Sequence, residues 1–97
     1  MRRERKKNDK VKEYHIGEYE ATVRFYESPY CLARAYLKIG TIVISGLSIR
    51  ENKDGDIFVS WPARKMEDGT YKNTVYTVDM GLNDMILDAY EVWDDER

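Results

Sequence analysis

Cysteine is almost missing from this chain of 97 residues, in which Cys31 is the only one, so no disulfide can form within the chain. Secreted domains of this size usually depend on several disulfides, because a small domain buries too little apolar surface to hold its fold otherwise. We therefore expect the protein to work in the reducing cytoplasm. Without a neighbouring base, the thiol of Cys31 is expected to be buried and inert.

Long hydrophobic runs are also missing, and none approaches the roughly 18 residues that a membrane-spanning helix needs. The basic N-terminus leads into the sequence Glu13-Tyr14-His15-Ile16 instead of the apolar segment of a signal peptide. We expect neither export nor insertion into a membrane.

The residue types that build most catalytic and metal sites are scarce. One histidine, His15, and one cysteine cannot make a typical zinc site, and neither has an evident catalytic partner. Asp54 and Asp56 flank Gly55, but the remaining ligands of a calcium-binding loop are absent. The glycines are isolated, so the chain has no glycine-rich phosphate loop. We predict that the protein is not an enzyme and binds no metal, cofactor or small-molecule substrate.

Charge is abundant and unevenly distributed along the chain. The 16 basic and 18 acidic residues give a formal net charge of -2. Basic residues gather near the N-terminus at Arg2, Arg3, Arg5, Lys6, Lys7, Lys10 and Lys12, and the acidic residues Asp94, Asp95 and Glu96 stand at the other end. Residues 1–13 show no hydrophobic periodicity, which predicts a flexible basic arm ahead of a single domain over residues 14–97.

Alternation of apolar and polar residues predicts five strands in succession. The pattern is seen over residues 19–25, 31–39, 41–50, 57–61 and 71–78. Gly40, the segment Asn52–Asp56 and the pair Asp68-Gly69 have the chemistry of tight turns, and Pro62 ends the fourth strand. Strands joined by such short turns favour an antiparallel meander.

The last segment changes to helical spacing. An apolar stripe recurs at Leu82, Met85, Ile86, Ala89, Tyr90 and Trp93. Asp79 or Asn83 is expected to cap the start of this helix. The predicted fold is therefore α+β, with a five-stranded, twisted antiparallel sheet covered on one face by a helix from about Leu82 to Trp93. Unpaired sheet edges favour a homodimer, in which two protomers pair through those edges.

Residues 58–78 carry a family signal. An apolar strand is followed by Pro62, a small residue, the basic pair Arg64-Lys65, an acidic-glycine turn and the triplet Tyr71-Lys72-Asn73. In this order and without a gap, the stretch resembles the SpoVG (stage V sporulation protein G, septation regulator) family. With one extra residue in the Asn52–Asp56 turn, the resemblance covers most of residues 19 to 93.

The resemblance implies a SpoVG-like fold, a homodimer, and a DNA- or RNA-binding regulator linked to septation and sporulation. By position, Arg64 and Lys65 match the family's basic pair, and Lys72 matches the basic residue of its triplet. The helix departs from the family, whose helix tends to begin with basic residues, because Met80-Gly81-Leu82-Asn83-Asp84 stands there. The basic arm precedes the point where family members usually start.

Basic side chains neutralise phosphates and release counterions, so the basic residues are the predicted nucleic-acid contacts. They are Arg64, Lys65, Lys72 and, from the arm, Arg2, Arg3, Arg5, Lys6 and Lys7. Trp61 and Tyr71 are the main candidates for stacking on bases, and Tyr36 and Tyr76 are further ones, although aromatic residues of a small sheet more often fill its core. The alternative function is a dimeric adaptor that docks a division or regulatory protein without specific nucleic-acid binding.

The acidic tail suggests a further hypothesis. Asp94, Asp95 and Glu96 would pair with the basic arm of a neighbouring subunit and compete with nucleic acid for its cations. A solvated helix end is the simpler interpretation.

Overall fold

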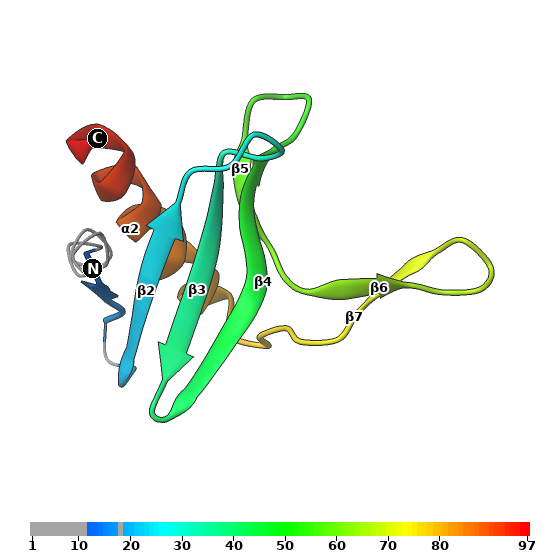
Figure 1. The fold of residues 1–97 in the computed structure, drawn as a ribbon, viewed down its shortest axis with the longest axis horizontal. Coiled ribbons are helices and arrows are strands. Elements are labelled where there is room, and N and C mark those ends of the chain that lie inside the picture. The colour runs from blue at the N-terminus through cyan, green and yellow to red at the C-terminus, as the bar shows by residue number, and fades with distance from the viewer. Residues whose placement is uncertain (1–11, 18) are drawn as a thin grey trace, which may run out of the picture.

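The computed structural model describes residues 12–17 and 19–97 (Figure 1). Five antiparallel strands form one sheet in the order of the chain: β1 (Tyr14–His15), β2 (Ala21–Tyr26), β3 (Ala33–Ile39), β4 (Ile42–Glu51) and β5 (Ile57–Ser60). β6 (Ala63–Lys65) and β7 (Tyr71–Asn73) form a separate two-stranded sheet, and α2 (Met80–Glu96) follows. The predicted α+β class, with a five-stranded antiparallel sheet and one C-terminal helix, is confirmed.

The fifth strand of the sheet is not the one that the alternation predicts. Only Tyr71–Asn73 of the segment 71–78 is a strand, and it pairs with Ala63–Lys65 outside the main sheet. Pro62 ends β5 and turns the chain away, so the residues that follow pair locally across the next turn. The fifth place is taken by β1, which pairs with β2 and is too short, at two residues, to show a period in the sequence.

The core lies between one face of the sheet and α2, which Figure 1 shows behind the strands. The buried apolar residues of the strands are Ala21, Val23, Phe25, Ala33, Ala35, Leu37, Leu47 and Ile49, and those of the helix are Leu82, Ile86, Ala89 and Tyr90. The ring of Phe25 lies 5.9 Å from that of Tyr90 and 5.7 Å from that of Trp93. These aromatic contacts hold the end of α2 on β2.

A β-bulge in β4 brings its apolar residues to the core face. Leu37 of β3 pairs with Ile44, whereas Ala35, two residues earlier, pairs with Leu47, so β4 carries an extra residue. Gly46 lies in the bulge with a φ of 91°. Because the bulge interrupts the two-residue period, Ile44 and Leu47 both point toward the core although they are three positions apart.

Asp79 caps α2, which decides between the two predicted caps. Its Oδ1 accepts a hydrogen bond from the backbone N–H of Gly81 at 2.9 Å, and its other carboxylate oxygen accepts from the hydroxyl of Tyr19. Asn83 instead accepts a hydrogen bond from the indole N–H of Trp61 at 2.8 Å. The helix therefore begins at Met80, two residues before the predicted start.

Candidate nucleic-acid interface

The β6–β7 hairpin projects from the sheet (Figure 1), and its turn follows from local sequence. The backbone N–H of Met66 donates to the carbonyl of Thr70 at 2.7 Å, and Gly69 takes a φ of 91° between them. Oδ1 of Asp68 accepts from the N–H of Thr70 at 3.0 Å and from its hydroxyl at 2.6 Å. These two donors hold the pKa of Asp68 below its usual value, the hydroxyl having the larger effect.

Hydrogen bonds to two backbone carbonyls fix the base of the hairpin. The side-chain amide of Asn73 donates to the carbonyl of Trp61 at 3.1 Å and to that of Pro62 at 3.3 Å. The backbone N–H of Thr74 also donates to the Pro62 carbonyl, at 2.9 Å. These hydrogen bonds therefore join the end of β7 to Trp61 and Pro62, which lead from β5 into β6.

The hairpin brings the three predicted basic contacts together. Arg64 pairs directly with Lys72 across the two strands, and Lys65 pairs with Tyr71. Since cross-strand partners share a face, Arg64 and Lys72 lie on one side of the hairpin, and Lys65 lies with Tyr71 on the other. All four residues are exposed, and in the part of the chain that the structure describes none of the three cations forms an ion pair.

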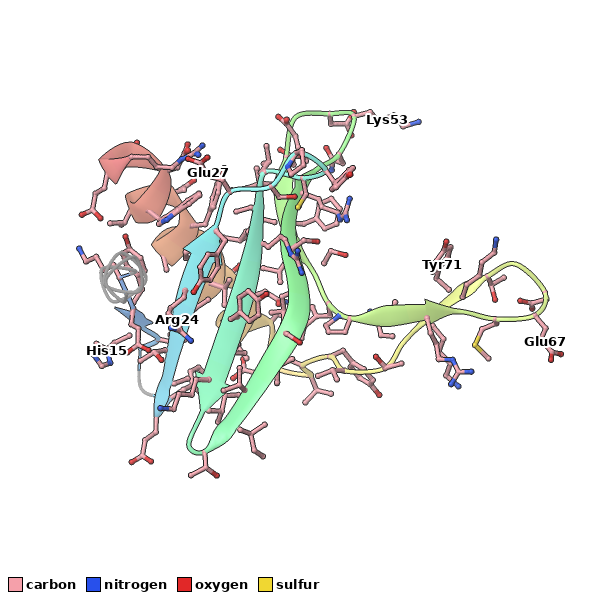
Figure 2. All side chains as sticks on the ribbon, viewed as in Figure 1. His15, Arg24, Glu27, Lys53, Glu67 and Tyr71 are labelled. Carbon is pink, nitrogen blue, oxygen red and sulfur yellow. The ribbon has the colours of Figure 1, made fainter. Side chains whose placement is uncertain are left out.

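The two main aromatic candidates differ in what they contact. Trp61 is half-buried against the core, and its indole N–H is held by Asn83 at 2.8 Å. Tyr71 is 71% exposed and stands clear of the sheet (Figure 2). Of the two rings, only that of Tyr71 presents an open face at which a base can stack.

The arm residues Arg2, Arg3, Arg5, Lys6 and Lys7 lie outside the described part of the chain, as does most of the predicted arm. Lys12 is described, and its Nζ lies 3.3 Å from Oε2 of Glu96. The hydroxyl of Tyr14 donates to Oε1 of the same carboxylate at 2.8 Å. The observed contact between this region and the acidic tail is therefore made within one chain.

These contacts change the acidity of both partners. Burial raises the pKa of Tyr14 to about 12, with further increases from the hydrogen bond to Glu96 and from its charge. The hydrogen bonds from Tyr14 and then Lys12 lower the pKa of Glu96.

The scarce catalytic residue types stay apart from one another. His15 lies on β1, and Cys31 lies just before β3 instead of on it, half-buried, with its thiol donating to the carbonyl of Ala33 at 3.3 Å. Over residues 12–17 and 19–97 no three His, Cys, Asp or Glu side chains are grouped as metal ligands. Within the same residues, no helix combines the length and apolarity required to cross a membrane.

One group of residues was predicted only in part, because Tyr36 was a candidate for stacking on bases but the arginines beside it were not candidates for phosphate contacts. The sheet face opposite α2 carries arginines and aromatic rings on β2, β3, β4 and β5, among them Arg24 and Tyr36. The alternation in β2 and β3 placed some of these residues on one polar side, but only the strand register shows which of them become neighbours.

The protein thus combines an antiparallel sheet covered by one helix with a basic hairpin that projects from the sheet. Comparisons with protein-family models, curated proteins and solved structures found no match to this chain. The likeness to the SpoVG family, and the function that it implies, therefore stay predictions.

Proposed function

We propose that this chain is a DNA- or RNA-binding regulatory protein of the SpoVG type, active as a homodimer in the cytoplasm and linked by that resemblance to septation and sporulation. The observation that supports it best is the pairing of Arg64 with Lys72 on the projecting hairpin. Like charges placed directly opposite on a sheet are destabilising, and a phosphate between them removes the repulsion.

The surroundings of the hairpin support an anionic ligand. Lys65 adds a third cation on the other side, and no carboxylate within the described residues forms an ion pair with any of the three. Glu67 lies at the tip (Figure 2), and the neighbouring Asp68 accepts hydrogen bonds from Thr70. A strand of nucleic acid along either side of the hairpin meets basic side chains first.

The helix is unsuited to this role. All the charged residues of α2 are acidic: Asp84, Asp88, Glu91, Asp94, Asp95 and Glu96. They repel phosphates, which supports the hairpin as the contact and agrees with the departure of this helix from the family pattern.

Apolar side chains exposed around the hairpin support a homodimer. They are Met66, Tyr76, Val78 and Met80, of which Val78 is 90% exposed. A two-stranded hairpin has little stability of its own in water, and a second copy of the chain would cover these residues. The sheet edges, β1 and β5, are two and four residues long and offer a shorter surface for pairing.

The test is a fluorescence-anisotropy titration of labelled duplex DNA, single-stranded DNA and RNA at several salt concentrations. Wild type is compared with Arg64→Ala/Lys65→Ala, with Lys72→Ala, and with Lys53→Ala, a matched control that removes a cation from the β4–β5 turn (Figure 2). We expect affinity to fall with salt and the hairpin variants to bind more weakly, with a salt slope reduced by about 0.9 for each duplex phosphate that the variant no longer neutralises. If all variants bound as tightly as wild type, the binding site would lie away from the hairpin.

The alternative is a dimeric adaptor that docks a regulatory or division protein. The same exposed apolar residues favour it, because they suit a protein surface as well as a second copy. Wild-type protein that binds none of the three nucleic acids at low salt would favour the adaptor.

A further inference from the structure

The face of the sheet opposite α2, called here the open face, carries three arginines that each lie beside an aromatic ring. Arg24 pairs with Tyr36 and Arg34 with Tyr26 across β2 and β3, and Arg50 pairs with Phe58 across β4 and β5. Figure 2 shows Arg24 on the side of the sheet turned to the viewer, with α2 behind the strands. Their chain neighbours, including Val23, Ala35 and Ile49, are buried under α2, so the two-residue period places all six on the open face.

Two of the three rings are in contact on this face. Tyr26 and Tyr36 meet edge to face, with centroids 5.3 Å apart and an interplanar angle of 82°. Both are half-buried, which limits their rotation, and Phe58 is exposed on β5. Rings fixed in place on a sheet lose little conformational entropy when a flat ligand stacks on them.

The cations of the open face have few counterions. Arg24 lies 3.9 Å from a carboxylate oxygen of Glu13, whereas Arg34, Lys38 and Arg50 form no ion pair with the residues that the structure describes. The Nε–H of Arg50 donates to the hydroxyl of Ser48 at 3.0 Å, which orients the guanidinium. A solvated polar sheet face, the ordinary case, usually mixes both signs of charge.

A hollow continues the open face at one end. It has a volume of about 470 Å³ and lies between the β2–β3 loop and the β4–β5 turn. Tyr30, which is 85% exposed, lines it together with Arg50 and Phe58, and Glu51 is the acidic residue on its wall. A base or sugar leaving the sheet surface would meet one further aromatic ring here, that of Tyr30.

We infer that the open face is a binding surface for single-stranded nucleic acid, which stacks its bases on Tyr36, Tyr26 and Phe58 and places its phosphates beside Arg24, Arg34 and Arg50. Unpaired bases expose flat faces that duplex DNA hides, so this pattern selects single strands. The acidic helix lies on the opposite side of the sheet, so the charge distribution also directs a polyanion to this face. The inference rests on the proposed function, and it assigns unpaired strands to a surface separate from the β6–β7 hairpin.

The inference is tested with a fluorescein-labelled oligothymidylate of about 12 nucleotides, a length within the range that small sheet domains cover. Tyr36→Leu removes a stacking ring, whereas Tyr36→Phe keeps it. Arg34→Gln removes an exposed cation from the open face, and Lys72→Gln makes the same change on the hairpin. Every variant is also titrated with duplex DNA.

We expect Tyr36→Leu to weaken binding of the oligothymidylate roughly 5- to 150-fold, the range for removing one base–aromatic stack. Tyr36→Phe and Lys72→Gln should stay within about twofold of wild type, while Arg34→Gln weakens binding and lowers the salt slope by about 0.7. Amide signals of β2 and β3 should shift when the strand is added. Because Arg34 is exposed, its variant keeps the test valid even where Tyr36→Leu loses the fold.

Three outcomes overturn the inference, and they bear differently on the proposed function. If the open-face variants bind the strand as wild type does while Lys72→Gln weakens it, the hairpin is the interface and the proposed function stands. If wild type binds duplex DNA but not the strand, the open face is left for a protein partner. If wild type binds neither of these, nor the RNA used to test the proposed function, the inference and the proposed function both fail.

Discussion

Gly46 is the residue on which the bulge in β4 depends. Its φ of 91° lies in the left-handed region, and a Cβ added there would lie 3.3 Å from Cγ of Pro62. A side chain at this position therefore meets two obstacles, the backbone conformation and the proline that ends β5.

Gly46→Ala is expected to destabilise the fold by about 2 kcal/mol, mainly through the cost of a left-handed residue with a Cβ. Urea unfolding followed by circular dichroism measures the difference. Ser45→Ala, at the exposed neighbouring residue, is the control and should change stability by less than about 0.5 kcal/mol. Equal stability of the two variants would mean that the bulge can relax without cost.

The raised pKa of Tyr14 makes the free energy of unfolding depend on pH in the alkaline range. Its pKa is raised to about 12 in the folded protein, whereas an unfolded tyrosine titrates near ~10. The folded state thus holds this proton more tightly, so the stabilisation is complete below pH ~10 and is lost as pH rises toward the folded value.

We expect the unfolding free energy of wild type to fall between about pH 10 and pH 12, and to fall less in Tyr14→Phe. The pKa of Tyr90 is also raised, by burial first, so the variant should keep part of the pH dependence. Urea unfolding at a series of pH values gives the comparison. A variant with the same pH dependence as wild type would contradict the role of Tyr14.

At the scale of elements, the β6–β7 hairpin depends on an amide that donates. Asn73 uses its Nδ2 to reach the carbonyls of Trp61 and Pro62, and a carboxylate cannot replace those hydrogen bonds. Asn52, in the β4–β5 turn, is used in the opposite sense, because its Oδ1 accepts from the N–H groups of Asp54 and Asp56.

Asn73→Asp is therefore expected to loosen the base of the hairpin, at a cost of about 1 kcal/mol. Amide hydrogen exchange at Arg64 and Lys72, which form a hydrogen-bonded pair of the hairpin, should accelerate. Asn52→Asp, the same chemical change, should leave exchange in its own turn nearly unchanged because a carboxylate accepts equally well. If the two substitutions changed amide exchange in their own turns equally, the role of the Asn73 amide as a hydrogen-bond donor would not matter for the hairpin.

Alternation in the sequence predicted extended segments better than it predicted their partners. Residues 71–78 alternate, yet their pairing was decided by Pro62, which directed Tyr71–Asn73 to a local partner. The two residues of β1 are too few to show a period. The basic hairpin residues were predictable because they are close in the chain, whereas Arg24 and Tyr36 become neighbours only through the register of β2 and β3.

At the scale of the whole molecule, charge is divided between the two sides of the sheet. The small net charge of -2 conceals an acidic helix on one side and an arginine-bearing sheet face on the other. Such a division orients a polyanion as it approaches, in a manner that weakens with ionic strength.

Assembly is tested at Val78, which has 90% of its surface exposed and is assigned to the proposed dimer contact. Val78→Asp should shift a dimer toward monomer while changing the stability of the monomer by no more than about 0.5 kcal/mol. Light scattering after gel filtration measures the mass. Thr41→Asp, on the exposed β3–β4 turn, is the control and should leave the mass unchanged. A dimer that survives Val78→Asp would place the contact elsewhere, such as at a sheet edge.

Trp61 connects the hairpin to the rest of the protein, because its carbonyl accepts from Asn73 while its indole N–H donates to Asn83 of α2. Indole fluorescence responds to such surroundings, so the chain contains an intrinsic optical reporter at the root of its projecting hairpin. Its second indole, Trp93, packs on Phe25 and under the guanidinium of Arg97, 4.5 Å away, near the C-terminal end of α2. In a Trp93→Phe variant, the indole emission of the unlabelled protein comes from Trp61 alone and responds to a ligand that moves the hairpin.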